Sequence, residues 1–205
     1  PFILRRVKKE VLTELPEKNI TVMNNEMTDE QRKIYEIVLE AQKAALEILK
    51  KGVSCKDADA AARDIIKNAG YGDYFGHGTG HGVGYLLNIH EGPANFAWQW
   101  RGTPQRLEEG MILTDEPGFY VEGSHGIRLE NELLVRAGKE NEYGQFMKFE
   151  SLTICPYDLD AVLVEELTRS EKTWLNAYHK ECYEKLSPYL NEYEKDKLKE
   201  FTREI

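Results

Sequence analysis

The sequence predicts an α+β fold, in which helices pack against an antiparallel sheet. Apolar residues recur at helical spacing near the start of the chain. The middle of the chain changes to short apolar runs separated by glycine and proline, and the tail returns to a helical pattern. The chain has 205 residues, of which 41% are hydrophobic and 31% charged, the balance of an ordinary globular protein. Helices, then strands, then helices is an order typical of the α+β class.

Two helices are expected after the first 28 residues. Thr28 followed by Gln31 indicates a capping box. The apolar residues after it recur at i, i+3, i+4 and i+7, which predicts an amphipathic helix over residues 29–50. Ser54 is expected to begin a second helix that runs to about Asn68.

Strands are expected in the middle of the chain and further helices in the tail. Four runs bounded by glycine and proline are predicted to be strands: Tyr85–Ile89, Met111–Thr114, Ile127–Val135 and Phe146–Ile154. In the tail, Thr168 and Glu171 indicate another capping box at the start of a long helix. A last short helix is predicted over Glu192–Phe201.

Charge and cysteine content exclude several classes of protein. The 36 Asp and Glu residues outnumber the 27 Lys and Arg residues, for a net charge of −9, so we expect no nucleic-acid partner. No stretch approaches the roughly 20 consecutive apolar residues of a membrane span. The 3 cysteines are widely spaced and odd in number, which argues against a disulfide framework and favours a cytoplasmic location.

Three histidines are candidates for a functional site because of the glycines around them. His77 and His81 lie in a stretch from Gly70 to Gly84 that contains seven glycines, and His90 follows nine residues after His81. Glycines allow a close approach of the backbone and leave the imidazole rings exposed in a cleft. A lone histidine is usually structural, but three so close together indicate a site. The two remaining histidines are expected to be surface or structural residues.

Two glutamates and an arginine extend this candidate site. Glu116 ends a short apolar run, and Glu130 lies inside a predicted strand, where a carboxylate is costly to bury unless it is paired or bound to a cation. Glutamate oxygens with an imidazole nitrogen suit a divalent ion such as Mn²⁺, Co²⁺ or Zn²⁺. Arg128, two residues before Glu130, is expected on the same strand face, where it would orient a ligating carboxylate. A structural ion pair is the alternative interpretation of these three residues.

Four motifs, in this order and spacing, resemble the catalytic core of Xaa-Pro aminopeptidases of the pita-bread metallopeptidase family. They are GHGTGHGVG (76–84), NIHEGP (88–93), TDEPGFY (114–120) and GIRLEN (126–131). The tail, with FESLTICPYDLD and WLNAYHKECYEKLSPYL, is similar to the C-terminal extension of the cytosolic members. The resemblance runs from about Tyr35 to Ile205 and implies a partial pita-bread fold. Residues 36–140 would be the C-terminal half of the catalytic domain, and 141–205 the extension.

The resemblance also implies residue roles and a reaction. His81, Glu116 and Glu130 would bind metal, with Glu130 bridging, while His77 and His90 would contact substrate and stabilise the tetrahedral intermediate. The implied reaction removes the N-terminal residue from peptides whose second residue is proline. The intact family uses two divalent ions, for which we expect Mn²⁺, and a homodimer is a further expectation.

The start of the chain departs from that family. The family completes its metal site with two aspartates on strands before the first predicted helix, and residues 1–27 contain no aspartate. Three ligands are expected to hold one ion weakly or none. A non-catalytic peptide-binding or protein-binding remnant, or a hybrid fragment without activity, is therefore the alternative to an enzyme.

Residues 1–35 resemble a different family, the Swi/Snf-type helicase-like ATPases, over the segment between their two lobes. No GxxxxGK[ST] phosphate loop occurs in the chain, so no ATPase activity is expected. A basic amphipathic arm is the alternative interpretation of this segment.

Overall fold

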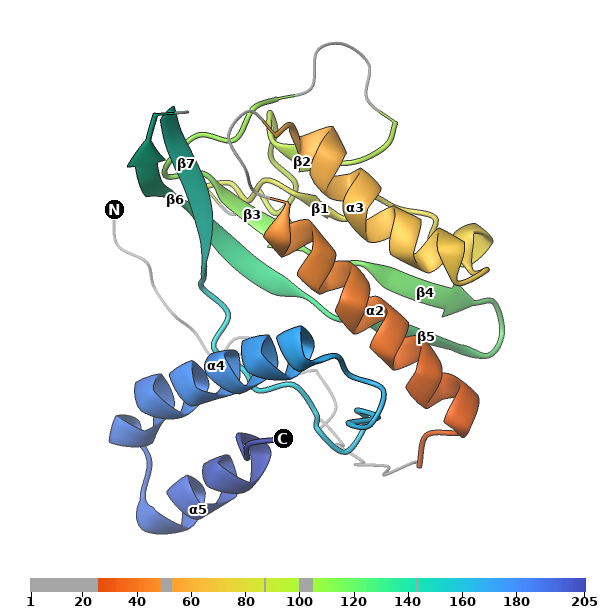
Figure 1. Ribbon diagram of the computed structural model, residues 1–205, viewed down its shortest axis with the longest axis vertical. Coiled ribbons are helices and arrows are strands. Elements are labelled where there is room, and N and C mark those ends of the chain that lie inside the picture. The colour runs from red at the N-terminus through yellow and green to blue at the C-terminus, as the bar shows by residue number, and fades with distance from the viewer. Residues whose placement is uncertain (1–25, 49–52, 87, 100–104, 143) are drawn as a thin grey trace, which may run out of the picture.

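The computed structural model describes residues 26–205, apart from 49–52, 87, 100–104 and 143. The helices are α2 (Asp29–Glu47), α3 (Cys55–Asn68), α4 (Arg169–Leu186) and α5 (Glu192–Phe201), with short 3-10 turns η1 (Gly72–Tyr74) and η2 (Ser187–Tyr189). The strands are β1 (Gly80–His81), β2 (Asn95–Phe96), β3 (Ile112–Asp115), β4 (Gly118–Val121), β5 (His125–Arg128), β6 (Asn131–Asn141) and β7 (Gly144–Ser151). Helices α2 and α3 lie side by side on one face of the strands (Figure 1). The predicted α+β class is confirmed.

All strand pairs in the described part of the chain are antiparallel. Strands β3, β6 and β7 form one sheet in the order β3-β6-β7, while β4 pairs with β5 and β1 with β2. An isolated bridge between Gly82 and Leu113 ties the end of β1 to β3. This bridge brings the glycine-rich segment against the strand that leads to Glu116.

The predicted capping boxes form as the sequence indicates. Thr28 and Thr168 each accept a hydrogen bond from the backbone N–H three residues later, and the Gln31 and Glu171 side chains return the bond. Asp57 and Ser54 make the same arrangement at α3. Each box satisfies N–H groups that would otherwise lack a partner at the helix start. Within the described residues, no helix has both the length and the apolar content that a membrane crossing requires.

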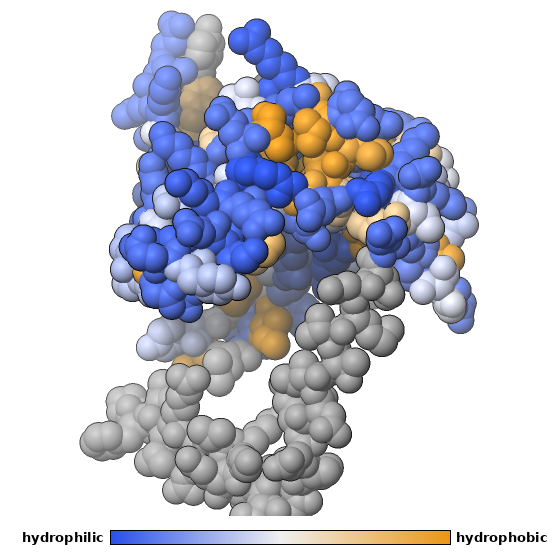
Figure 2. Space-filling model, turned by 90° about the horizontal axis from the view of Figure 1, so that it is seen from below, coloured by the Kyte–Doolittle hydropathy of each residue, from blue (hydrophilic) through white to orange (hydrophobic). Residues whose placement is uncertain are grey.

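The largest group of buried side chains joins α2 to the tail. Val38 and Leu39 of α2 contact a cluster that includes Phe119 of β4, Tyr157 of the tail segment and Leu175 of α4. The tail therefore belongs to the core of the domain. Seen from below, the surface of the molecule is mainly hydrophilic, with a group of apolar side chains in the upper half of the view (Figure 2).

Two strand predictions are wrong. Residues 85 and 86 of the predicted strand Tyr85–Ile89 form an exposed turn, because the backbone bonds from Gly82 and Gly84 to Glu91 and Asn88 close a loop there. The predicted single strand Ile127–Val135 is two strands, β5 and β6, interrupted at 129–130. Pro117 lies opposite this interruption and has no N–H to donate to a ladder. The apolar content of the sequence indicated neither the turn at residues 85 and 86 nor the interruption at 129–130.

Gly80 is needed where β1 crosses β3. A Cβ at this position would lie 1.9 Å from the carbonyl oxygen of Thr114. Gly80→Ala is expected to lower the free energy of unfolding by about 1–3 kcal/mol, because the backbones must separate. Gly76→Ala is the control, since its Cβ would meet no atom within 4 Å. Equal effects of the two substitutions in urea unfolding would contradict this explanation.

Candidate functional site

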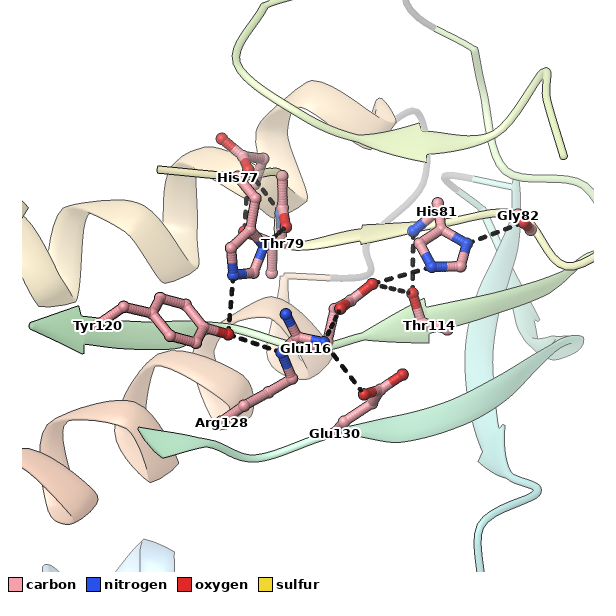
Figure 3. A network of polar contacts seen from close by, with 11 residues as sticks. His77, Thr79, His81, Gly82, Thr114, Glu116, Tyr120, Arg128 and Glu130 are labelled. Atoms are coloured by element: carbon pink, nitrogen blue, oxygen red, sulfur yellow. Dashed lines mark hydrogen bonds and ion pairs between the residues drawn. The ribbon is translucent and has the colours of Figure 1, made fainter. Parts of the chain in front are cut away.

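Five of the six predicted site residues line one cavity of about 400 Å³: His77, His81, His90, Glu116 and Arg128. The sixth, Glu130, lines a neighbouring cavity of about 390 Å³, to which His81 also contributes. His77 lies just before β1, His81 in β1 and His90 in the loop between β1 and β2. Glu116 lies between β3 and β4, Arg128 ends β5, and Glu130 lies between β5 and β6. Figure 3 shows His77, His81, Glu116, Arg128 and Glu130 in one network.

The break between the two ladders positions both glutamates. Asp115 pairs with Asn131 on one side of the break, and Gly118 pairs with Arg128 on the other. Glu116 and Glu130 therefore face each other across strands at a point where neither ladder continues. The prediction that Glu130 lies inside a strand is wrong, because it lies between β5 and β6. Its side chain is 43% exposed, whereas that of Glu116 is 9% exposed.

His81 and Glu116 are in direct contact. The distance from Nε2 of His81 to Oε1 of Glu116 is 3.0 Å, and Thr114 donates its hydroxyl to the same Oε1 at 3.0 Å. Nδ1 of His81 lies 3.0 Å from the carbonyl oxygen of Gly82, which can only accept, so Nδ1 carries a proton. In the neutral ring, Nε2 then presents a lone pair to the carboxylate. Two such atoms at this distance need a proton or a cation between them, which is the chemistry of a metal-ligand pair.

Arg128 forms an ion pair with Glu116 and lies close to Glu130. Its NH1 lies 3.1 Å from Oε2 of Glu116 and 3.8 Å from Oε2 of Glu130. Even so, burial, with the neighbouring Glu116 carboxylate, raises the pKa of Glu130 above its ordinary value. The site therefore still favours an additional positive charge.

Tyr120 connects His77 to this ion pair. Arg128 donates from Nε to the Tyr120 hydroxyl at 2.7 Å, and Nε2 of His77 lies 3.1 Å from the same hydroxyl. Gly118 and Gly126 make room for the ring, because a Cβ on either would lie within 2.5–2.7 Å of Tyr120 atoms. Figure 3 shows this hydrogen-bonded connection from His77 to Glu116.

His90 reaches the site from the loop between β1 and β2. Its ring centroid lies 4.2 Å from that of His81, and the residue is exposed. The His90 side chain is therefore accessible to a molecule that enters the cavity.

Two of the three candidate metal ligands, His81 and Glu116, are in contact in the described part of the chain. Across that part of the chain, no group of three or more His, Cys, Asp or Glu side chains is arranged to hold a metal ion. His81 and Glu116 fit a metal as a pair, but Glu130 is turned toward Arg128. Among the described residues, the donors in contact are therefore one imidazole nitrogen and one carboxylate, ligand types that a divalent ion accepts.

Sequence reasoning missed Thr114 and Tyr120. Thr114 had a signal, since it lies two residues before Glu116 and so on the same strand face. Tyr120 had only its place in TDEPGFY, because its partners depend on the register of β4 and β5. Of the two other histidines, His125 begins β5. His179 is structural: it is 1% exposed, accepts a hydrogen bond from Tyr157 N–H, and burial lowers its pKa to about 4.

Comparisons with known proteins identify the family. Residues 17–137 match metallopeptidase family M24, and residues 145–205 match the C-terminal region of peptidase M24. The chain belongs to metallopeptidase family M24. The first match begins inside residues 1–35, for which we predict a helicase-like origin; that origin and the division at 35/36 stay predictions, and residues 1–25 lie outside the described part of the chain.

Within that family, the relatives are Xaa-Pro aminopeptidases. The chain is 42% identical over 158 residues to aminopeptidase P1 of Arabidopsis thaliana, covering 76% of this chain and 24% of the relative. It is 40% identical over 139 residues to Xaa-Pro aminopeptidase 1 of Dictyostelium discoideum, covering 67% and 22%. The chain therefore spans about a quarter of the length of these relatives.

Solved structures confirm the partial pita-bread fold. The X-prolyl aminopeptidase of Caenorhabditis elegans, a cytosolic enzyme with a di-nuclear active site, matches with a TM-score of 0.78 and 30% identity, over 88% of this chain and 30% of that one. Prolidase from Pyrococcus furiosus matches with a TM-score of 0.51 and 43% identity, over 62% and 34%. The predicted resemblance to Xaa-Pro aminopeptidases is thus confirmed.

Proposed function

We propose that this chain carries the histidine and glutamate part of a metal-dependent Xaa-Pro aminopeptidase site. It would bind a divalent ion through His81, Glu116 and Glu130 and act on peptides whose second residue is proline. The observation that carries the proposal is the 3.0 Å contact between His81 and Glu116 in the wall of a cavity that also contains His77 and His90. The names of the relatives support the substrate class.

Each residue has a role that follows from its contacts. A divalent ion supplies Lewis acidity and lowers the pKa of a water molecule. His77, held between the Gly78 carbonyl and the Tyr120 hydroxyl, presents its ring to a peptide that enters the cavity, as does the exposed His90. Arg128 orients Glu116 and offsets part of the negative charge of the two carboxylates.

A second candidate function is peptide binding without cleavage. It is favoured by the lack of a three-donor group among the described residues and by the lack of aspartate in residues 1–27. The intact histidines would still contact a peptide. The two candidates differ in turnover and agree in peptide binding.

Metal binding and hydrolysis of an Xaa-Pro dipeptide test the proposal. The native chain is expected to bind Mn²⁺ in calorimetry, and His81→Ala to weaken binding by more than about 100-fold, beyond the 10–100-fold of an outer-shell change. Glu130→Gln is expected to abolish turnover. His125→Ala is the control, because it removes an imidazole that does not line the cavity.

The outcomes separate the two candidates. Proline-dependent turnover that requires added metal would support the enzyme. Peptide binding without turnover would support the second candidate, and neither metal nor peptide binding would contradict both.

Three finer properties belong to this proposal. We infer Mn²⁺ as the ion because carboxylate and imidazole ligands suit it. A cytoplasmic location is supported by the cytosolic relative from C. elegans. A homodimer is supported by Tyr85, Leu86 and Ile89, which are 96%, 82% and 67% exposed in one loop.

A further inference from the structure

A buried ion pair on α3 lies behind the glycine-rich segment of the site. Asp59 is fully buried, and Arg63 lies one helical turn later. The guanidinium binds the carboxylate at two points, with Nε 2.9 Å from Oδ2 and NH2 2.8 Å from Oδ1. A buried pair of this kind adds little net stability, because removing both charges from water is costly. Its contacts with the rest of the structure are therefore more informative about its role.

Arg63 fixes the backbone on both sides of Gly76. NH1 donates to the carbonyl oxygen of Phe75 at 2.9 Å, and NH2 donates to that of His77 at 2.7 Å. The guanidinium carbon lies 4.2 Å from the ring centroid of Phe75 and 3.8 Å from that of Trp98. The two rings hold the plane of the guanidinium, so that its donors point at both carbonyl groups.

Asp59 connects the ion pair to Glu116 as well, and we call the contacts of Asp59 and Arg63 with this segment the clamp. Its Oδ1 accepts from the backbone N–H of Thr79 at 3.0 Å and from the Thr79 hydroxyl at 2.9 Å. The carbonyl oxygen of Thr79 in turn accepts from the backbone N–H of Glu116 at 2.6 Å. One buried carboxylate is thereby connected, through a single residue, to the backbone of a proposed metal ligand.

The segment needs such a clamp because of its composition. Gly76, Gly78 and Gly80 alternate with Phe75, His77 and Thr79, and glycine loses more conformational freedom on folding than any other residue. We infer that Asp59 and Arg63 are positioning residues. They fix the backbone of His77 and of Glu116, and so determine where these two side chains lie in the cavity. The importance of that geometry rests on the proposed function, whereas the clamp itself does not.

Arg63→Lys tests the clamp in the full chain. Lysine keeps the charge next to Asp59, but one ammonium cannot make the planar set of bonds to Asp59, Phe75 and His77. In the native protein, the His77 ring should give one sharp set of ¹⁵N and ¹H NMR signals, with Nδ1 donating its proton to the carbonyl oxygen of Gly78. In the variant, these signals should shift and broaden, and Mn²⁺ affinity should fall by about 10–100-fold.

Two comparison variants make the result decisive. Leu175→Ala removes a buried side chain of α4, which lies in a different cluster from α3, and should lower Tm while leaving the His77 signals in place. Asp59→Asn, an isosteric change, should shift the His77 signals as Arg63→Lys does, and serves if the latter does not fold. Unchanged His77 signals in both clamp variants would overturn the positioning role. Failure of the native chain to bind Mn²⁺ would contradict only the proposed function, since the ring signals are recorded without metal.

Discussion

Phe96→Ala is expected to lower the free energy of unfolding by about 3–5 kcal/mol, the usual cost of removing a fully buried aromatic ring. Phe96 is 0% exposed and lies in β2, opposite Gly80. Its ring packs with Phe149 of β7, at a centroid distance of 6.2 Å. The substitution leaves a cavity between β2 and the sheet, and the contacts of the ring with its apolar neighbours are lost.

The same substitution should also disturb the site. The Phe96 ring comes within 3.2 Å of the position that a Cβ on Gly80 would occupy, so it lies directly against β1. We expect weaker metal binding by Phe96→Ala even under conditions in which the variant is folded. Phe201→Ala is the control, because this ring is 55% exposed on α5. A loss of less than about 1 kcal/mol for Phe96→Ala in guanidinium unfolding would show that the core collapses onto the vacated space.

Glu36→Gln is expected to remove a pH dependence of stability. Glu36 of α2 is 9% exposed; its Oε1 accepts the N–H of Leu163, while Oε2 has no hydrogen-bond partner among the described residues. Burial, followed by the carboxylates of Glu166, Glu171 and Glu165, raises the pKa of Glu36 from 4.5 to about 7. The folded protein therefore binds a proton here that the unfolded chain releases.

The sign of the effect follows from this difference in proton binding. The contribution of Glu36 is fully present below pH 4.5 and is lost as the pH rises through about 7. The whole shift corresponds to about 3 kcal/mol, and we expect about 2 kcal/mol because solvent screens the neighbouring carboxylates. Urea unfolding between pH 4.5 and 8 should show this decline in the native chain and a flatter profile in Glu36→Gln.

A matched control is available on the surface. Glu122→Gln lies in the exposed turn between β4 and β5 and should leave the pH profile of the native chain unchanged. Parallel profiles for the native chain and Glu36→Gln would show that Glu36 is ionised in the folded protein at neutral pH, which would contradict the assignment.

The local signals of the sequence were reliable where the structure depends on neighbouring residues. The capping boxes at Thr28 and Thr168 formed because the bonding groups lie three residues apart. The helix Glu192–Phe201 has the predicted bounds for the same reason. The glycine-rich pattern singled out His77 and His81, which the structure places in one cavity.

The arrangement of the site depends on contacts that sequence spacing does not report. Glu116 faces Glu130 because two ladders stop at Pro117, and Arg63 reaches His77 because α3 packs behind the glycine-rich segment. Periodicity reflects hydrogen bonds between near neighbours, whereas register and buried ion pairs depend on which distant elements meet. The sequence by itself therefore determined the helices, the family and the candidate residues. Only the tertiary structure decided how these residues face one another, because cross-strand pairing and burial are properties of the packed chain.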